Sequence, residues 1–152
     1  MWKENFIEYA FKKTKTEKIH ENEVNTKIEK MMEKLKKAFD KNPAAKIFEE
    51  SEALALSIMI NKYFMQPSEI LKKCCEIGLK KNEAYGADNI LRFKEKGLIV
   101  RLSDKYARIK NLLENEKNKT KIDEFNETIK DTLEDIINYS IYGRMLADKI
   151  WN

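Results

Sequence analysis

The stretch LIVRLSDKYARIKNLLE, residues 98–114, has the apolar period of an amphipathic α-helix, and it determines the fold class. At about 100° per residue, its apolar side chains recur on a single face. The members of this stripe are Ile99, Leu102, Tyr106, Ile109 and Leu113. A stripe of this kind must face a hydrophobic core, so the segment predicts one helix of a larger bundle.

The composition of the whole chain predicts the same fold class. Hydrophobic residues make up 42% of the 152 residues, which is enough for the core of one domain, and charged residues make up 37%. Only four glycines and two prolines interrupt a sequence rich in Lys, Glu, Leu and Ile. We therefore expect an all-α helical bundle of about six helices.

Periodicity and helix breakers place the expected helices. They cover residues 2–13, 16–40, 43–64, 67–81, 88–114 with a bend or stop at Gly97, and 123–149, with a polar linker at 114–121. Residues 1–42 are the most separable part, and we expect an N-terminal helical hairpin packed on a nucleotide-handling core of residues 43–152. The alternative is that residues 1–42 complete a single bundle.

Charge and motif content exclude several classes of protein. The net charge of +4 permits an anionic partner, but it does not favour nucleic acid over a small ligand, because no known DNA-binding motif is present. His20 is the only histidine, so one chain cannot build a histidine-based metal site. Adjacent Cys74 and Cys75 are poorly placed to bridge each other and predict a reducing compartment. With no secretory signal and no membrane-length apolar run, we expect a cytoplasmic protein without a membrane partner.

A basic cluster flanks the apolar stripe of residues 98–114. Arg101, Asp104, Lys105 and Arg108 lie about a third of a turn from that stripe, where side chains can line a cleft against a neighbouring helix. Two guanidinium groups offer forked donors to phosphate oxygens, and the lysine adds a point charge. Asp104 would orient an arginine or help to hold a metal. The alternative is a solvated surface on which Asp104 pairs with both arginines.

The last expected helix carries an acidic face that complements this cluster. Glu127, Asp131, Asp135 and Asn138 share one face and offer the oxygen ligands that Mg²⁺ prefers. Residues 88–114 hold seven cations and four acids, whereas residues 123–138 hold six acids and one lysine. If the two segments pack together, either they pair ions directly or they share an anionic ligand, with or without a bridging metal.

Three sequence boxes, in order, resemble the nucleotide modification associated domain type 1 family over residues 66–146. The first box matches Lys81, Asn82, Tyr85 and Gly86; the second matches Arg101, Asp104, Lys105, Arg108, Asn111 and Leu112; the third matches Glu127, Asp131, Thr132, Asp135, Asn138 and Tyr139. The acid that precedes Tyr-Gly in the family pattern is replaced by Ala84. The resemblance implies a role in phage nucleotide metabolism and base modification.

Two further features bear on the ligand. Tyr85 offers a stacking surface for a base, and Gly86 allows close backbone approach; the alternative is a helix stop at Gly86. The acidic helix is also similar to the last metal-binding helix of MazG-like nucleotide pyrophosphohydrolases. In those enzymes a Glu-x-x-Glu motif binds Mg²⁺, and Glu49 and Glu52 are the matching pair here.

These observations leave three functional hypotheses. The first is a helical domain that binds a phosphorylated nucleotide, either a modified deoxynucleotide or a nucleotide signal. The second is a Mg²⁺-dependent hydrolase of nucleoside triphosphates. The third is a non-enzymatic phage protein that inhibits a host defence system through protein contacts. The loss of the acid at Ala84 favours binding over catalysis, and the long amphipathic helices are compatible with a homodimer.

Overall fold

The chain folds into a helical bundle, as its composition predicts. The computed structural model describes residues 2–12, 15–41, 43–85, 88–118 and 122–150, with side chains described throughout except at 2, 82–85, 88 and 122–127. The helices are α1 (Trp2–Ala10), α2 (Val24–Asp40), α3 (Ala45–Tyr63), α4 (Pro67–Tyr85), α5 (Asp88–Leu91), α6 (Lys94–Asn118) and α7 (Ile122–Ala147), with a 3-10 turn at Glu21–Glu23. No β-strand occurs within these ranges, so the all-α prediction is confirmed.

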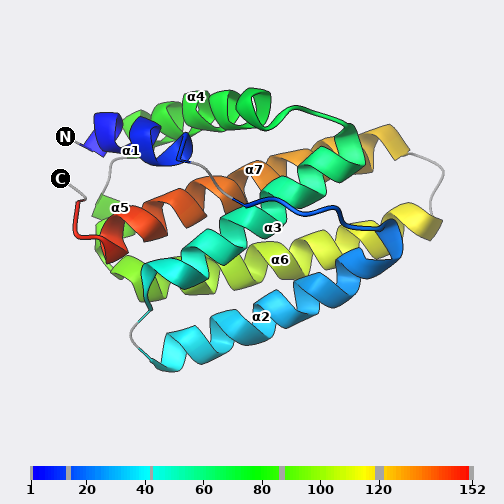
Figure 1. Ribbon diagram of the computed structural model, residues 1–152, viewed down its shortest axis with the longest axis horizontal. Helices are drawn as coiled ribbons and strands as arrows, with labels where there is room; N and C mark the ends of the chain where they lie inside the picture. Colours follow the sequence, from blue (N-terminus) through cyan, green and yellow to red (C-terminus); the bar gives the residue numbers. More distant parts are fainter. Residues whose placement is uncertain (1, 13–14, 42, 86–87, 119–121, 151–152) are drawn as a thin grey trace.

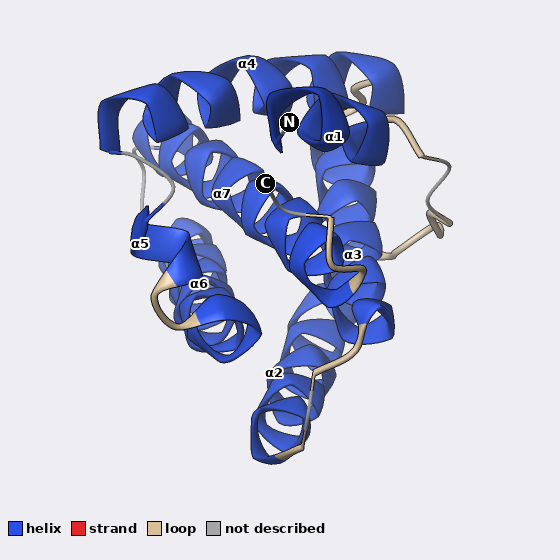
Figure 2. Ribbon diagram, turned by 90° about the vertical axis from the view of Figure 1, so that its left-hand side faces the viewer, coloured by secondary structure: helices blue, strands red, loops and turns tan. Residues whose placement is uncertain are grey.

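Helix α7 lies at the centre of the bundle. Helices α3 and α6 pack along it, α4 and α1 cover it on one side, and α2 closes the opposite side against α6 and α3 (Figures 1 and 2). Apolar side chains that spread around the second half of α7 explain this position. Ile136, Ile137, Ile141 and Met145 are all fully buried, so the helix needs neighbours on most of its circumference.

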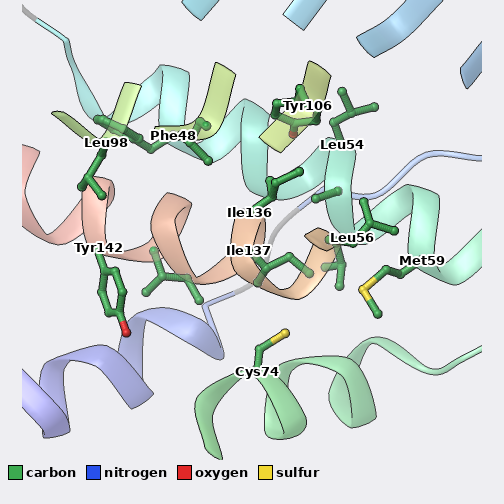
Figure 3. Packing of buried hydrophobic residues seen from close by; sticks show 14 of the residues in the cluster. Phe48, Leu54, Leu56, Met59, Cys74, Leu98, Tyr106, Ile136, Ile137 and Tyr142 are labelled. Atoms are coloured by element: carbon green, nitrogen blue, oxygen red, sulfur yellow. The ribbon is translucent and has the colours of Figure 1, made fainter. Parts of the chain in front are cut away.

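The core sits where α3, α6 and α7 meet. The stripe on α6 is buried as predicted from Ile99 to Ile109, and Tyr106 reaches fully into the interior (Figure 3). Phe48 of α3 packs so closely on Gly143 of α7 that an added Cβ would lie 2.1 Å from its ring. A glycine is therefore required at that point for α3 and α7 to approach each other.

The two cysteines belong to this core. Cys74 and Cys75 are buried and free on α4. Burial raises the pKa of the Cys75 thiol to about 11 and raises that of Cys74 further still. Neither thiol is a reactive thiolate at neutral pH, as expected for structural residues.

The predicted helix at residues 16–40 begins too early. The segment 15–20 is extended and runs along α3, where the Glu17 amide donates to Ser57 Oγ at 3.0 Å and Asn61 Nδ2 donates to the Glu17 carbonyl at 3.1 Å. Ile19 is buried in the core from this segment. Backbone bonds to α3 side chains replace helical ones, so tertiary contacts override the local helix preference.

The predicted helix at residues 88–114 breaks earlier than expected and ends later. The break lies between α5 and α6, where Lys94 has a positive φ of 51°, whereas Gly97 lies inside α6. A Cβ on Gly97 would lie 2.7 Å from the Cβ of Phe93, so the glycine accommodates the turn before it without breaking the helix itself. Helix α6 continues to Asn118, into the predicted polar linker.

The N-terminal helices do not pair with each other as a compact hairpin. Helix α1 packs on α7 and α4, and α2 packs on α6 and α3 at the other side of the molecule (Figure 1). Tyr9 donates to Asp148 Oδ2 at 2.8 Å, and Asn5 donates to the Ile150 carbonyl at 2.8 Å, so α1 joins the two ends of the chain. The division into residues 1–42 and 43–152 stays a prediction about domains.

Within the described residues, no helix combines the length and apolar character needed to cross a membrane. Both tryptophan side chains, at positions 2 and 151, fall outside the described side chains.

Candidate functional site

A cleft of about 360 Å³ opens where α4, α6 and α7 come together. Three cations from two helices line it: Lys81 from α4, and Arg101 and Lys105 from α6. They face Asp135 and Asn138 of α7. The rest of the lining is Gly78, Asn89, Ile90, Tyr139 and Tyr142. The basic and acidic segments therefore border one hollow, which is the arrangement that their opposite charges predict.

Asp135 is held by two of the three cations. Lys81 Nζ lies 2.7 Å from one of its carboxylate oxygens, and Lys105 Nζ lies 3.1 Å from the other. This is direct ion pairing between the basic and acidic helices, the first of the two arrangements expected from charge. Asp135 is the one carboxylate in the described lining, so the three cations still leave a net positive charge.

Arg101 is oriented by neighbours on both sides. Its guanidinium donates to the side-chain oxygen of Asn89 on α5 and lies 5.7 Å from the ring centroid of Tyr139 on α7. A planar cation that is held in this way keeps its remaining donors in a fixed direction. Arg101 therefore presents preorganised donors at the rim of the cleft.

Asn138 forms the polar floor of the cleft. Its side chain is only 4% exposed, and its Oδ1 has no hydrogen-bond partner among the described residues. Across the floor, an added Cβ on Gly78 would lie 3.2 Å from Asn138 Nδ2 and 3.1 Å from the Tyr142 hydroxyl. The absence of a side chain on Gly78 thus keeps this floor open. Buried acceptors without partners are uncommon in folded proteins, and this one lies where a donor on a ligand could reach it.

The other two members of the predicted basic cluster lie outside the cleft. Arg108 and Asp104 are exposed, and Asp104 faces a shallow surface beside α2. Arg101 and Lys105 are four residues apart and share one face of α6, whereas Asp104 and Arg108 share the adjacent face, turned further from α7. The predicted four-residue cluster is therefore split by the structure.

The predicted metal ligands are only partly brought together. Asp135 and Asn138 line the cleft, Asp131 is exposed outside it, and Glu127 lies outside the described side chains. Asn82, Tyr85 and Gly86 also lie outside the described side chains. Among described residues, no group of three histidine, cysteine, aspartate or glutamate side chains is placed to hold a metal. A Mg²⁺ site here stays a prediction.

The Glu-x-x-Glu pair on α3 does not face the cleft. Glu49 is exposed, and Glu52 is fully buried, where it accepts a hydrogen bond from the guanidinium of Arg144 on α7. Arg144 in turn lies 5.3 Å from the ring of Tyr9. Glu52 is therefore committed to an internal ion pair.

Sequence reasoning did not identify Gly78, Asn89 and Tyr142 as cleft residues. Gly78 and Lys81 are three residues apart on one helix and therefore lie on the same face. This spacing could have indicated that the glycine lies beside the site of the lysine. Asn89 lies next to the predicted start of a helix, and nothing in its surroundings indicates a partner twelve residues later.

Comparison with known proteins supports the resemblance drawn from the three boxes. The family model of nucleotide modification associated domain 1 matches residues 81–146. This range contains all the charged residues of the cleft: Lys81, Arg101, Lys105 and Asp135. No curated protein and no solved structure matches the chain.

Proposed function

Residues 81–146 form a nucleotide modification associated domain 1, and from this premise we propose that the cleft between α4, α6 and α7 binds a phosphorylated nucleotide. Lys81, Arg101 and Lys105 bind the phosphate oxygens. The observation that carries the proposal is the convergence of these three cations, from two helices, on one hollow whose described lining contains a single carboxylate.

The phosphate chemistry follows from how the cations are held. Arg101 is fixed by Asn89 and Tyr139, so it supplies a forked, charge-assisted pair of donors to phosphate without a large loss of side-chain freedom. Asp135 holds the ammonium groups of Lys81 and Lys105 at the cleft. A phosphate group between them accepts hydrogen bonds from both ammonium groups.

The floor of the cleft recognises the rest of the nucleotide. Asn138 offers an amide, the group that pairs with donor and acceptor edges of a base or with a sugar hydroxyl. The ring of Tyr139 provides an apolar wall beside Arg101. Because Oδ1 of Asn138 has no partner in the described chain, a ligand that donates to it removes an unfavourable buried acceptor.

A thermal-shift screen of nucleoside mono-, di- and triphosphates, with and without Mg²⁺, tests the proposal. A ligand that binds only the folded chain raises Tm. We expect a shift for phosphorylated nucleotides and none for the corresponding nucleosides. Lys81→Ala should weaken binding about tenfold, the value of one charge-assisted hydrogen bond, whereas the exposed neighbour Lys80→Ala should change it less than twofold.

Product analysis of any hit separates binding from catalysis. Release of phosphate or pyrophosphate with Mg²⁺ that is lost in Asp135→Asn would favour the hydrolase over a binding protein. The binding proposal expects no turnover, and it expects Asp135→Asn to bind as well as the parent or more tightly, because a negative charge leaves the cleft. A complete absence of shifts would reject the proposal and favour a protein partner for the charged faces.

A further inference from the structure

A second hollow continues the cleft along the start of α6. It has a volume of about 630 Å³ and shares Asn89, Ile90 and Arg101 with the cleft. Its other lining residues are Phe39, Arg92, Phe93, Lys96, Gly97, Leu98 and Val100. Arg101 therefore stands between two adjoining hollows, and a ligand that it holds has room to extend on either side.

The described lining of these two hollows carries a surplus of positive charge. Their described lining includes five cations, namely Lys81, Arg92, Lys96, Arg101 and Lys105, and one acid, Asp135. The chain has 30 cationic and 26 acidic residues, and removing these five and this one leaves 25 of each sign. The described lining of these hollows therefore sums to +4, whereas the rest of the chain is neutral in sum.

Exposed aromatic side chains accompany the cations. Phe93 is 70% exposed and Phe39 is 40% exposed, although large apolar side chains are usually buried. Lys96 Nζ lies 5.3 Å from the centroid of the Phe39 ring, as Arg101 does from Tyr139 at 5.7 Å. Gly97 leaves space for Phe93, whose Cβ would lie 2.7 Å from a side chain there. Two cations of these hollows therefore lie against aromatic rings, and Phe93 adds an exposed ring beside them.

We propose that the two adjoining hollows bind a single-stranded oligonucleotide, so that the nucleotide in the cleft is one unit of a strand. This inference rests on the proposed function and specifies its substrate class. Proteins that bind single strands combine a basic groove along the phosphates with aromatic rings on which bases stack. From Lys96 to Lys105 the cations extend about 13 Å along α6, at about 1.5 Å per residue, which suits several phosphates.

The same features disfavour other occupants of the second hollow. A duplex hides its base faces, so it would leave the rings of Phe39 and Phe93 in water. A protein partner would have to supply an acidic surface that also carries apolar groups for these rings. A single strand supplies regularly spaced negative charge and exposed π-faces in one chemical class.

Fluorescence anisotropy with 5′-labelled oligothymidylates of two, four and six nucleotides, competed by thymidine monophosphate, tests the inference. We expect affinity to rise at least tenfold between the mononucleotide and the tetranucleotide. Phe93→Ala and Lys96→Ala should each lower tetranucleotide affinity about tenfold and leave mononucleotide affinity within twofold, while Arg101→Ala lowers both. Phe64→Ala, at a residue that is 89% exposed outside both hollows, is the control and should change neither.

Salt dependence gives a second readout that does not depend on stacking. The slope of log affinity against log salt concentration should become shallower by about 0.7 in Lys96→Ala, the value for one phosphate contact on a single strand. Phe93→Ala should leave the slope unchanged.

The outcomes separate this inference from the proposed function. Mononucleotide binding that does not strengthen with length would overturn the inference and leave the proposed function standing. Length-dependent binding that is insensitive to Phe93→Ala and Lys96→Ala, or tighter binding of a duplex of the same length, would also overturn it. If neither mononucleotides nor oligonucleotides bind, both fail.

Discussion

Two polar regions of this protein differ in how far their polar groups find partners within the fold. The interior polar cluster, formed by Ser51, Glu52, Tyr106, Ser140 and Arg144, joins α3, α6 and α7 inside the bundle, and every member has a hydrogen-bond or ion-pair partner in the cluster. The described lining of the cleft has more cations than acids, and it includes an amide oxygen without a partner in the described chain. The first region completes its interactions within the fold, and the second leaves some for a ligand.

The difference shows why charge alone is a poor guide to a site. Glu52 and Arg144 are the most deeply buried ion pair in the described chain, yet they satisfy each other. Lys81 and Lys105 are more exposed and share one carboxylate. A buried pair with matched charges indicates structure, whereas a partly exposed group with surplus charge indicates binding.

The largest expected effect comes from breaking the buried pair. Glu52→Ala leaves the Arg144 guanidinium, whose side chain is 6% exposed, without its carboxylate. We expect a loss of about 3–5 kcal/mol in the free energy of unfolding, measured by urea denaturation. The exposed Glu49→Ala, one turn earlier on α3, should stay within about 0.5 kcal/mol of the parent. If Glu52→Ala lowers the free energy of unfolding by less than about 1 kcal/mol, the Glu52–Arg144 pair does not stabilise the fold as proposed.

A smaller effect is expected from the hydroxyl at the centre of the interior polar cluster. Tyr106 donates to the Ser51 carbonyl at 2.7 Å and lies 3.2 Å from Ser51 Oγ, which also accepts from Ser140 Oγ at 2.9 Å. Tyr106→Phe keeps the ring and removes these bonds, so the free energy of unfolding should fall by about 1–3 kcal/mol. Unchanged denaturation would show that the network adds nothing to stability.

The sequence predicts more of the cleft than of the interior polar cluster. The period of residues 98–114 predicted the buried stripe, and the spacing on α7 placed Asp135 beside Asn138 on one face. Arg101 and Arg108 both lie beside the apolar stripe of α6. Their spacing does not show which of them faces α7, because that depends on where the neighbouring helix packs. That choice depends on long-range packing and separates the cleft residues from their exposed neighbours.

The interior polar cluster was harder to foresee than the cleft. Glu52 resembled half of a metal motif in sequence, and its partner Arg144 lies 92 residues away. A buried charge needs an oppositely charged or hydrogen-bonding partner. No pattern in the sequence around Glu52 indicates that its partner is Arg144. The extended path of residues 15–20 was missed for the same reason, since its hydrogen-bond partners Ser57 and Asn61 are on α3.

Glu134 of α7 gives a prediction about the pH dependence of stability. Its side chain is 3% exposed and lies 3.1 Å from Lys73 Nζ. Burial raises its pKa above the ordinary 4.5, more than the Lys73 ammonium lowers it, and Asp131 and Asp135 raise it further. Because the folded pKa lies above the unfolded one, the contribution of Glu134 to stability is present below about pH 4.5 and is lost as pH rises through the raised pKa.

Denaturation of Glu134→Gln across pH 4 to 7 checks this sign. The free energy of unfolding of the variant, relative to that of the parent, should increase as pH rises. This increase should be smaller than the loss expected for Tyr106→Phe. If the parent instead becomes the more stable of the two as pH rises, the Lys73 ammonium lowers the pKa of Glu134 more than burial raises it.

The most direct test of the account is a calorimetric titration of a nucleoside triphosphate into two matched variants, Arg101→Ala and Arg108→Ala. The two arginines lie on the same helix and carry the same charge, but only Arg101 lines the cleft. Both variants should unfold within about 0.5 kcal/mol of the parent, as exposed and partly exposed positions do. We expect Arg101→Ala to weaken binding at least tenfold and Arg108→Ala to weaken it less than threefold. Equal losses, or a greater loss for Arg108→Ala, would show that the phosphate does not bind in the cleft.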